Sequence, residues 1–220
     1  MKVKICGLTR VEDAQIAVEE GAWALGFVFY RQSPRYIAPE KVSQILASLA
    51  KIGRVPDKTV GVFVNSPPEE ILATVALSGV NTIQLHGDES PASVQQLAES
   101  LKPQSSNISL IKAFRLKSIA DLTNPLPYLP YVTSILCDAA HGSAYGGTGM
   151  IADWSLVSKL GLSKPLILAG GLNPENIIQA IHVAKPFAVD LSSGLESRPG
   201  CKDHDKIRYL FAAIRGSNAH

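Results

Sequence analysis

The chain has 220 residues, of which 46% are hydrophobic and 18% are charged. This balance supplies a sizeable core and excludes an intrinsically disordered protein, and the length suits one large α/β domain or two small ones. The net charge is only +2, which argues against a protein that binds nucleic acid or anionic membranes through a broad basic field.

The three cysteines, Cys6, Cys137 and Cys201, are scattered, with no CxxC pair and no spacing typical of metal ligands. An odd, sparse set is typical of reduced thiols rather than of a disulfide framework. The first seven residues alternate and then stop at a glycine, unlike a signal peptide. The longest apolar stretch, residues 21–30, is well short of the roughly 20 residues that a membrane helix needs. We therefore expect a cytoplasmic protein without a metal site.

Short apolar runs rich in β-branched residues recur along the chain, separated by turn signals and amphipathic stretches. We predict strands at residues 3–6, 24–29, 59–64, 81–85, 108–113, 133–137, 165–169 and 187–191. A helix is expected after each strand, the last one over residues 203–214, and residues 102–107 are expected to form a loop.

Several of these helices are expected to begin at recognisable signals. Thr9, followed three residues later by Glu12, predicts a capping box for the first helix. Ser66 and Ser90, each followed by a proline, predict N-caps with proline in the first turn. A further helix is expected from about Pro39, where apolar residues recur at core-facing spacing.

Eight strand–helix units in a chain of this length predict a closed (β/α)8 barrel, the TIM-barrel fold. Strands this short and apolar are typical of parallel strands buried on both faces. The alternative, a doubly wound open sheet, usually has fewer strands and a GxGxxG turn after the first one, which is absent here. No linker or shift in composition divides the chain, so we predict a single domain over residues 1–220.

In such a barrel the chemistry is expected at the carboxyl ends of the strands. Gly170 and Gly171 follow the seventh predicted strand, and Ser193 and Gly194 follow the eighth. Glycine lets backbone N–H groups approach an anion, and these two loops are the customary phosphate site of the fold. Either turn alone is more often just a tight turn, but together they predict a site for a small phosphorylated substrate. Gly147, in a glycine loop, either adds a wall to this site or acts as the hinge of a lid.

Two reactive side chains end other predicted strands. Cys6 ends the first strand, where a small buried hydrophobe and a functional thiol are both reasonable readings. Asp138 ends an apolar strand, so its carboxylate must lie at the barrel mouth or be buried at great cost, which favours a role in the site. Cys137 should point the opposite way, into the core.

Three further residues at this end complete the candidates. Arg35 is either a solvated loop charge or a fork that grips a substrate carboxylate. His86 is more typical of a satisfied structural histidine than of a functional one. Asp190, at the end of the eighth strand, is included among the candidates for substrate binding.

Several segments together carry a resemblance to a known family. They are KICGLT at residues 4–9, GFVF at 26–29, SPR at 33–35, QLHG at 84–87, GGTG at 146–149, LAGGL at 168–172 and DLSSGLE at 190–196. In this order, and along almost the full length, the chain resembles the phosphoribosylanthranilate isomerases of tryptophan biosynthesis.

The resemblance implies a cofactor-free Amadori rearrangement, with N-(5-phosphoribosyl)anthranilate as the small-molecule partner. Cys6 would be the general base and Asp138 the general acid. Arg35 would bind the anthranilate carboxylate, and the loops after the last two strands would hold the phosphate. No nucleic acid or membrane partner is expected, and the protein would be a monomer or a homodimer.

The implied roles conflict with the ordinary protonation states of the two catalytic groups. A thiol with a pKa of about 8.5 and a carboxyl with a pKa of about 3.9 would each carry the wrong protonation state at neutral pH. Burial would raise both pKa values, which suits Asp138 but not Cys6, so a nearby cation or helix N-terminus is required. Two alternatives remain: the barrel isomerase of the histidine pathway, which would want an aspartate in place of Cys6, and a non-catalytic barrel that binds a phosphorylated metabolite.

Overall fold

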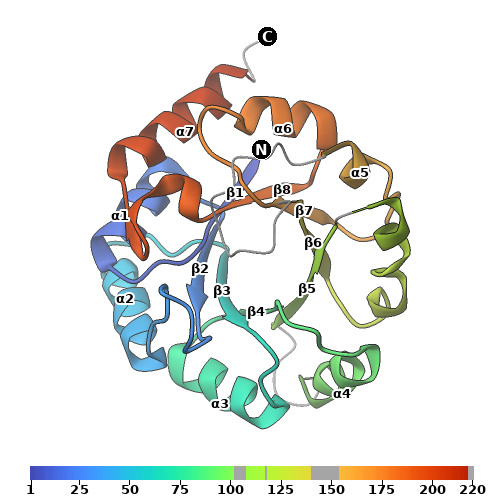
Figure 1. Cartoon of the computed structure of the whole chain (residues 1–220). Coiled ribbons are helices and arrows are strands. Elements are labelled where there is room, and N and C mark those ends of the chain that lie inside the picture. Colours follow the sequence, from blue (N-terminus) through green and yellow to red (C-terminus); the bar gives the residue numbers. More distant parts are fainter. Residues whose placement is uncertain (102–107, 117, 140–153, 218–220) are drawn as a thin grey trace.

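The fold is a closed barrel of eight parallel strands in chain order, surrounded by helices (Figure 1). It was obtained as a computed structural model, which describes residues 1–101, 108–116, 118–139 and 154–217. The strands are β1 (Lys2–Ile5), β2 (Ala24–Val28), β3 (Lys58–Phe63), β4 (Thr82–Leu85), β5 (Ser109–Arg115), β6 (Ser134–Asp138), β7 (Leu166–Ala169) and β8 (Ala188–Leu191). The predicted (β/α)8 barrel is confirmed, and each predicted strand lies within two residues of its observed bounds.

Seven α-helices lie outside this barrel in the part of the chain that the structure describes. They are α1 (Val11–Glu20), α2 (Pro39–Lys51), α3 (Pro68–Ser78), α4 (Pro91–Leu101), α5 (Trp154–Ser158), α6 (Ile177–Ala184) and α7 (His204–Ser217). Among the described residues no helix is long and apolar enough to cross a membrane.

Strand side chains alternate between the two faces of the barrel wall. Ile5, Leu25 and Cys137 face outward, into the large core that the helices share, which confirms that Cys137 is a core residue. A smaller apolar cluster, which includes Leu136 and Ile167, lies inside the barrel beside β5 to β8. Buried polar residues, among them Lys4, Gln84 and Asp190, also face the interior.

The barrel closes where the first strand meets the last. In β1 and β8, Lys4 lies opposite Asp190 and Ile5 opposite Leu191. The backbone N–H of Cys6 extends this ladder by donating to the carbonyl of Leu191 at 2.8 Å. Two ends of the chain that are far apart in sequence therefore form one wall of the barrel.

The predicted N-caps are partly wrong. Ser90 accepts a hydrogen bond from the backbone N–H of Ser93, as an N-cap should. Neither α1 nor α3 has a side-chain cap, because each helix begins one residue beyond its predicted start, so that Arg10 and Pro67 occupy the N-cap positions. Thr9 instead donates its hydroxyl to the carbonyl of Gly200, and so ties the first loop to the end of the chain.

The expected α-helix after β5 is also wrong, because two 3₁₀ turns, Ile119–Thr123 and Leu126–Tyr128, take its place. Pro125, Pro127 and Pro130 lie in this segment. Each proline removes an N–H donor and disfavours the helical conformation of the residue before it, so a regular helix cannot propagate. A small hairpin after β8, formed by β9 (Glu196–Arg198) and β10 (Cys201–Lys202), was not predicted either.

Candidate active site

The carboxyl ends of the strands bring the predicted residues together at one rim of the barrel. Cys6 is the first residue after β1, and Asp138 is the last residue of β6. Both follow the inward-facing alternation, since Ile5 and Cys137 face outward. Cys6 is 8% exposed, whereas Asp138 is half-buried. A buried thiol and a more accessible carboxyl thus occupy the same rim.

A buried ion pair lies directly beneath Cys6 in the barrel interior. Lys4 Nζ is 2.8 Å from Asp190 Oδ2, and Lys4 is fully buried. Gly26 of β2 supplies the room: a Cβ added there would lie 2.8 Å from Cys6 Sγ and 3.1 Å from Lys4 Nζ. Asp190, predicted to bind substrate, is therefore committed through one oxygen to the chain's own lysine.

The charges in this interior set the protonation of Cys6 and Lys4. Burial raises the pKa of the Cys6 thiol, while the charge and hydrogen bond of Lys4 lower it in part. For Lys4, burial alone would lower the pKa, but the carboxylate of Asp190 outweighs it and raises the pKa above its ordinary value. Lys4 is therefore an ammonium at neutral pH, and Cys6 at rest is a thiol.

His86 belongs to the same interior. Burial lowers its pKa to about 4, and the charges of Lys4 and Arg115 add to the effect against that of Asp190. Its Nδ1 lies 3.0 Å from Nε2 of Gln84, which donates, so the neutral ring carries its proton on Nε2. The prediction of a structural histidine whose hydrogen-bonding groups have partners is confirmed for Nδ1.

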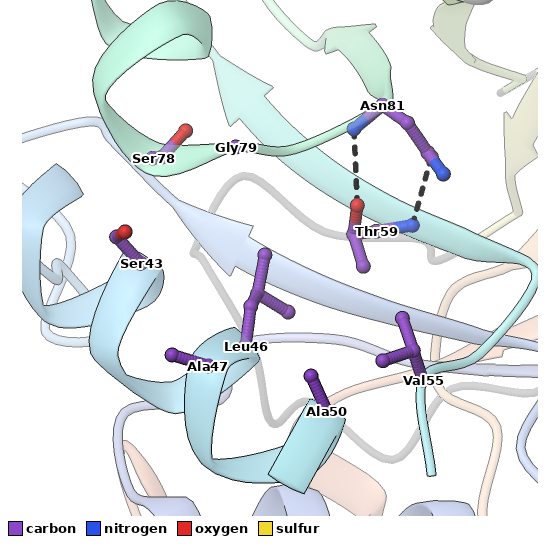
Figure 2. A pocket seen from close by; sticks show the side chains of 9 residues that line it. All are labelled: Ser43, Leu46, Ala47, Ala50, Val55, Thr59, Ser78, Gly79 and Asn81. Carbon is purple, nitrogen blue, oxygen red and sulfur yellow. Dashed lines mark hydrogen bonds between the residues drawn. The ribbon is translucent and has the colours of Figure 1, made fainter. Parts of the chain in front are cut away.

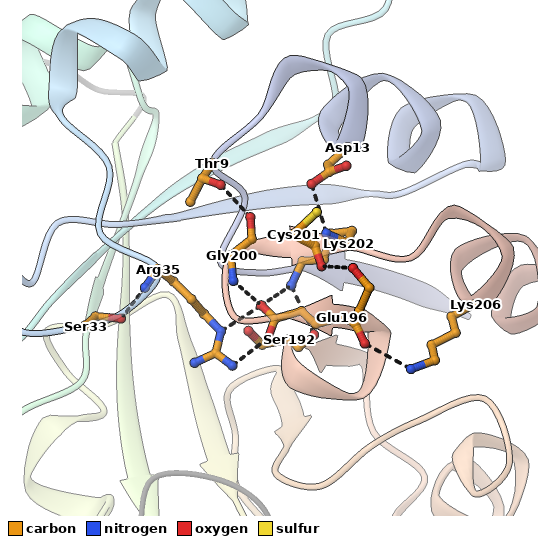
Figure 3. A network of polar contacts seen from close by, with 11 residues as sticks. Thr9, Asp13, Ser33, Arg35, Ser192, Glu196, Gly200, Cys201, Lys202 and Lys206 are labelled. Carbon is orange, nitrogen blue, oxygen red and sulfur yellow. Dashed lines mark hydrogen bonds and ion pairs between the residues drawn. The ribbon is translucent and has the colours of Figure 1, made fainter.

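Arg35 is not a solvated loop charge. Its guanidinium donates from Nε to Glu196 Oε1 at 2.8 Å and from Nη2 to Glu196 Oε2 at 2.6 Å. Lys202 Nζ and the backbone N–H of Gly200 donate to the same carboxylate at 3.1 and 3.2 Å (Figure 3). Burial alone would raise the pKa of Glu196, but these donors lower it overall, so the carboxylate stays ionised.

Gly7 joins this cluster to the first loop. Its φ is +77°, and a Cβ there would lie 2.6 Å from Cδ of Arg35 and 3.0 Å from the hydroxyl of Ser192. The loop after β1, the loop after β2 and the loop after β8 therefore meet at one point, which only a glycine can occupy.

The loops after β7 and β8 also meet, as the predicted phosphate site requires. Gly170 and Gly171 have φ values of +95° and +63°, the left-handed region that favours glycine. A Cβ on Gly194 would collide with the backbone carbonyl of Leu172 in the other loop. Ser193 is exposed beside it, in a short 3₁₀ turn (Ser193–Leu195) whose first N–H groups have no partner within the turn. Gly147 lies outside the described residues.

Three residues of the site were missed by sequence reasoning: Lys4, Glu196 and Lys202. Each is at most 8% exposed. For Lys4 a signal was present, because a lysine at an inward position of a buried strand demands an ionic partner. Lys202 and Glu196 gave no such signal, because nothing in the sequence indicated the hairpin that buries them.

A separate hollow of about 400 Å³ lies at the opposite end of the barrel wall (Figure 2). Leu46, Ala47 and Ala50 of α2 line it, together with Thr59 near the start of β3 and Asn81 just before β4. Its position at the amino ends of the strands separates it from Cys6 and Asp138. Among the described residues, no group of three or more His, Cys, Asp or Glu side chains could hold a metal ion.

Comparison with known proteins completes the description of the site. Residues 3–213 match the family model of N-(5'-phosphoribosyl)anthranilate (PRA) isomerase. The N-(5'-phosphoribosyl)anthranilate isomerase of Gloeothece citriformis is 42% identical over 214 residues, which cover 97% of this chain and 94% of that protein.

Two solved structures are similar over nearly the whole chain. One contains monomers of the dimeric phosphoribosylanthranilate isomerase of Thermotoga maritima, with a TM-score of 0.80, 39% identity and coverage of 98% and 99% of the two chains. The other is a phosphoribosyl anthranilate isomerase in complex with reduced 1-(o-carboxyphenylamino)-1-deoxyribulose 5-phosphate, with a TM-score of 0.80, 40% identity and the same coverage.

Proposed function

The chain belongs to the N-(5'-phosphoribosyl)anthranilate isomerase family, and from this membership we propose how its residues perform the reaction. The enzyme converts N-(5-phosphoribosyl)anthranilate into 1-(2-carboxyphenylamino)-1-deoxy-D-ribulose 5-phosphate in tryptophan biosynthesis. Cys6 is the general base and Asp138 the general acid. This assignment rests on one observation: both side chains face inward at the same rim of the barrel, at the carboxyl ends of β1 and β6.

The two groups act in sequence on the ribose. Asp138 gives a proton to the ring oxygen as the bond from that oxygen to C1 breaks, which leaves a Schiff base. Cys6, as a thiolate, then removes the proton from C2, and the electrons of that C–H bond form the enolamine. A proton then adds to C1 while the C2 hydroxyl loses its own, which gives the keto product, and transfer of a proton from the Cys6 thiol back to Asp138 restores the enzyme. No step consumes an oxidant, so two well-placed groups suffice.

Arg35 is the group for the anthranilate carboxylate. A guanidinium binds carboxylates in a planar, bidentate fashion, and Glu196 fixes the orientation of the Arg35 fork from one side. Arg35 is 23% exposed, so the fork is accessible from the rim. This proposal gives Glu196 and Lys202 the role of positioning Arg35 rather than of touching the substrate.

The phosphate is held between the loops after β7 and β8. Gly170, Gly171, Ser193 and Gly194 lie where these loops approach each other, and backbone N–H groups in such turns bind phosphate oxygens. Gly147 is proposed as an additional wall on sequence grounds alone. Asp190, whose Oδ2 is bound to Lys4, is given a positioning role beneath the substrate.

The test of the catalytic pair is activity on phosphoribosylanthranilate without added metal or cofactor. Cys6→Ala and Asp138→Asn should each reduce kcat by about 10²–10⁴-fold, the usual contribution of general acid–base catalysis. Binding of the reduced product analogue should remain within a few-fold of wild type. Near-normal kcat in both variants would refute the assignment of these two residues.

The assembly and location of the enzyme are proposed as a cytoplasmic homodimer of single-domain subunits spanning residues 1–220. The relative from Thermotoga maritima is described as dimeric. The hollow of Figure 2 is lined by both apolar and polar side chains, and among its apolar residues Val55 is 54% exposed. Apolar surface of this kind is typical of subunit contacts. Sedimentation of the purified chain distinguishes dimer from monomer.

A further inference from the structure

Lys4 is a cation close to the sulfur of Cys6. Cys6 Sγ and Lys4 Nζ lie 2.8 and 3.1 Å from the same point, the position of a Cβ on Gly26. Both side chains rise from β1 or its end toward the barrel interior. Because β2 has a glycine there, no side chain separates the ammonium from the sulfur.

The other charged groups that act on Cys6 stabilise a thiolate less than Lys4 does. Lys202 on β10 and Arg35 after β2 both act on Cys6, but both are bound to Glu196, and Lys4 has the largest charge effect on the thiol. Asp190 on β8 is an anion and opposes a thiolate. His86 is neutral at physiological pH, because its pKa is lowered to about 4.

Asp190 keeps Lys4 charged. One carboxylate oxygen binds Lys4 Nζ at 2.8 Å, and the other is a buried atom without a hydrogen-bond partner among the described residues. A lysine in an apolar interior without such a carboxylate would tend to lose its proton. The ammonium has three N–H donors, so it can serve Asp190 with one and the sulfur of Cys6 with another.

We propose that Lys4, held as an ammonium by Asp190, is the positioning residue that allows Cys6 to act as the base, by donating a hydrogen bond to its thiolate. The inference rests on the proposed function of Cys6 and deepens it. A thiolate base requires a nearby cation, and Lys4 is that cation. It was not identified from the sequence. Lys4 itself does not touch the substrate.

The direct test is a pH titration of the Cys6 thiol, followed by the ultraviolet absorbance of the thiolate. Cys137→Ala and Cys201→Ser are introduced first, so that Cys6 is the remaining thiol. In this background Lys4→Met should raise the titration midpoint by about one pH unit or more, which lowers the thiolate fraction at neutral pH about tenfold. Lys112→Met is the matched control, because Lys112 is a buried lysine paired with Glu89 rather than with the site, and it should leave the midpoint unchanged.

A second variant guards against a simple failure to fold. Lys4→Met leaves Asp190 buried without its cation, whereas the double variant Lys4→Met/Asp190→Asn replaces the ion pair by neutral groups of similar size. The midpoint should still be raised in the double variant, because Lys4 has a larger effect on Cys6 than Asp190 has. A folded double variant with the midpoint of its parent would overturn the proposal.

Kinetics distinguish this proposal from the proposed function itself. At neutral pH the Lys4 variants should lose about tenfold or more in kcat with little change in KM. The loss should shrink as the pH rises, since hydroxide then forms the thiolate without help. If the parent enzyme itself fails to turn over phosphoribosylanthranilate, the proposed function is wrong, while the thiol titration still decides the role of Lys4. A loss in kcat that is the same at every pH would show a merely structural lysine.

Discussion

Two buried ion pairs near the rim of the barrel differ in how completely their carboxylates are satisfied. Glu196 accepts two hydrogen bonds from Arg35, one from Lys202 and one from the backbone of Gly200. Asp190 accepts one from Lys4, and its second oxygen is buried without a hydrogen-bond partner in the part of the chain that the structure describes. A buried acceptor without a hydrogen-bond partner destabilises the fold. The chain accepts this cost at Asp190, beneath Cys6, and avoids it at Glu196.

Burial and charge alone therefore do not define the role of an ion pair. The cluster around Glu196 joins Arg35, Lys202 and a backbone N–H to one carboxylate and fixes the hairpin and the Arg35 fork, as Figure 3 shows. The pair of Lys4 and Asp190 acts on the reacting sulfur, since both of its charges affect the Cys6 thiol. We therefore expect changes in the first cluster to affect stability most and changes in the second to affect protonation most.

The largest effect on stability is expected from Glu196→Gln. An amide cannot compensate Lys202, which is 3% exposed, and removing one partner of a buried pair typically costs about 3–5 kcal/mol. Chemical denaturation measures the loss, and Glu175→Gln, at an exposed glutamate, is the control. A loss below about 1 kcal/mol is typical of a weak surface ion pair. It would contradict the expectation that the Glu196 cluster acts chiefly on stability.

The next largest difference in stability is expected between two double variants, each of which replaces both members of one ion pair by neutral residues. Lys4→Met/Asp190→Asn should stay within about 1 kcal/mol of wild type, because neutral groups of similar volume often replace a buried ion pair without loss. Lys202→Met/Glu196→Gln should cost about 2 kcal/mol more, since Arg35 and the Gly200 N–H still need an anion. Equal losses in denaturation of the two double variants would contradict the distinction.

The pH dependence of stability should reveal the polar interior through His86. Its pKa is about 4 in the folded chain and about 6.5 in the unfolded chain. Between these values the unfolded state binds more protons, so stability is fully present above pH 6.5 and falls as the pH drops toward 4.

The ring of His86 is only partly buried, so we expect a contribution on the order of 2 kcal/mol across this range. His86→Gln should flatten the curve of unfolding free energy against pH by that amount. His182→Gln, at an exposed histidine of α6, should leave the curve as it is. An unaltered slope in the first variant would mean that the interior does not disfavour the imidazolium.

The smallest effect on stability is expected from Arg35→Ala. Lys202 and Gly200 still serve Glu196 in this variant, and a partly exposed charge pair contributes about 1 kcal/mol or less. Substrate binding should suffer more, with a raised KM and a nearly constant kcat, because the fork contacts ground and transition states alike. A large fall in kcat at unchanged KM would instead give Arg35 a part in the chemistry.

Sequence reasoning located the strands because their signal is local. An apolar run closed by a glycine or a charge marks a buried strand, and the rule that chemistry lies at the carboxyl ends led from there to Cys6, Arg35 and Asp138. Of these, the structure adds a partner for Arg35 that the sequence does not reveal, because Glu196 lies 161 residues further along the chain.

The incorrect predictions have identifiable physical causes. Thr9 has the sequence of a cap, but the carbonyl of Gly200 offers its hydroxyl another partner. The helix expected after β5 fails where Pro125 and Pro127 interrupt it. The hairpin β9–β10 follows no recognisable strand signal, since Glu196–Arg198 and Cys201–Lys202 are too short to show alternation. Tertiary contacts therefore decide the role of Thr9 and the formation of the hairpin, whereas the prolines act locally.

Closure between β1 and β8 has a consequence for how the chain becomes active during its synthesis. Lys4 leaves the ribosome well before Asp190, its counterion, which follows 186 residues later. Until then Lys4 is an ordinary solvated lysine, and Cys6 has no low-dielectric surroundings. Joining ends so distant costs about 5 kcal/mol in chain entropy, which the completed ladder must offset. Isomerase activity in a nascent or fragmented chain would therefore report that the last strand has docked, since the reacting sulfur acquires its electrostatic environment in that one event.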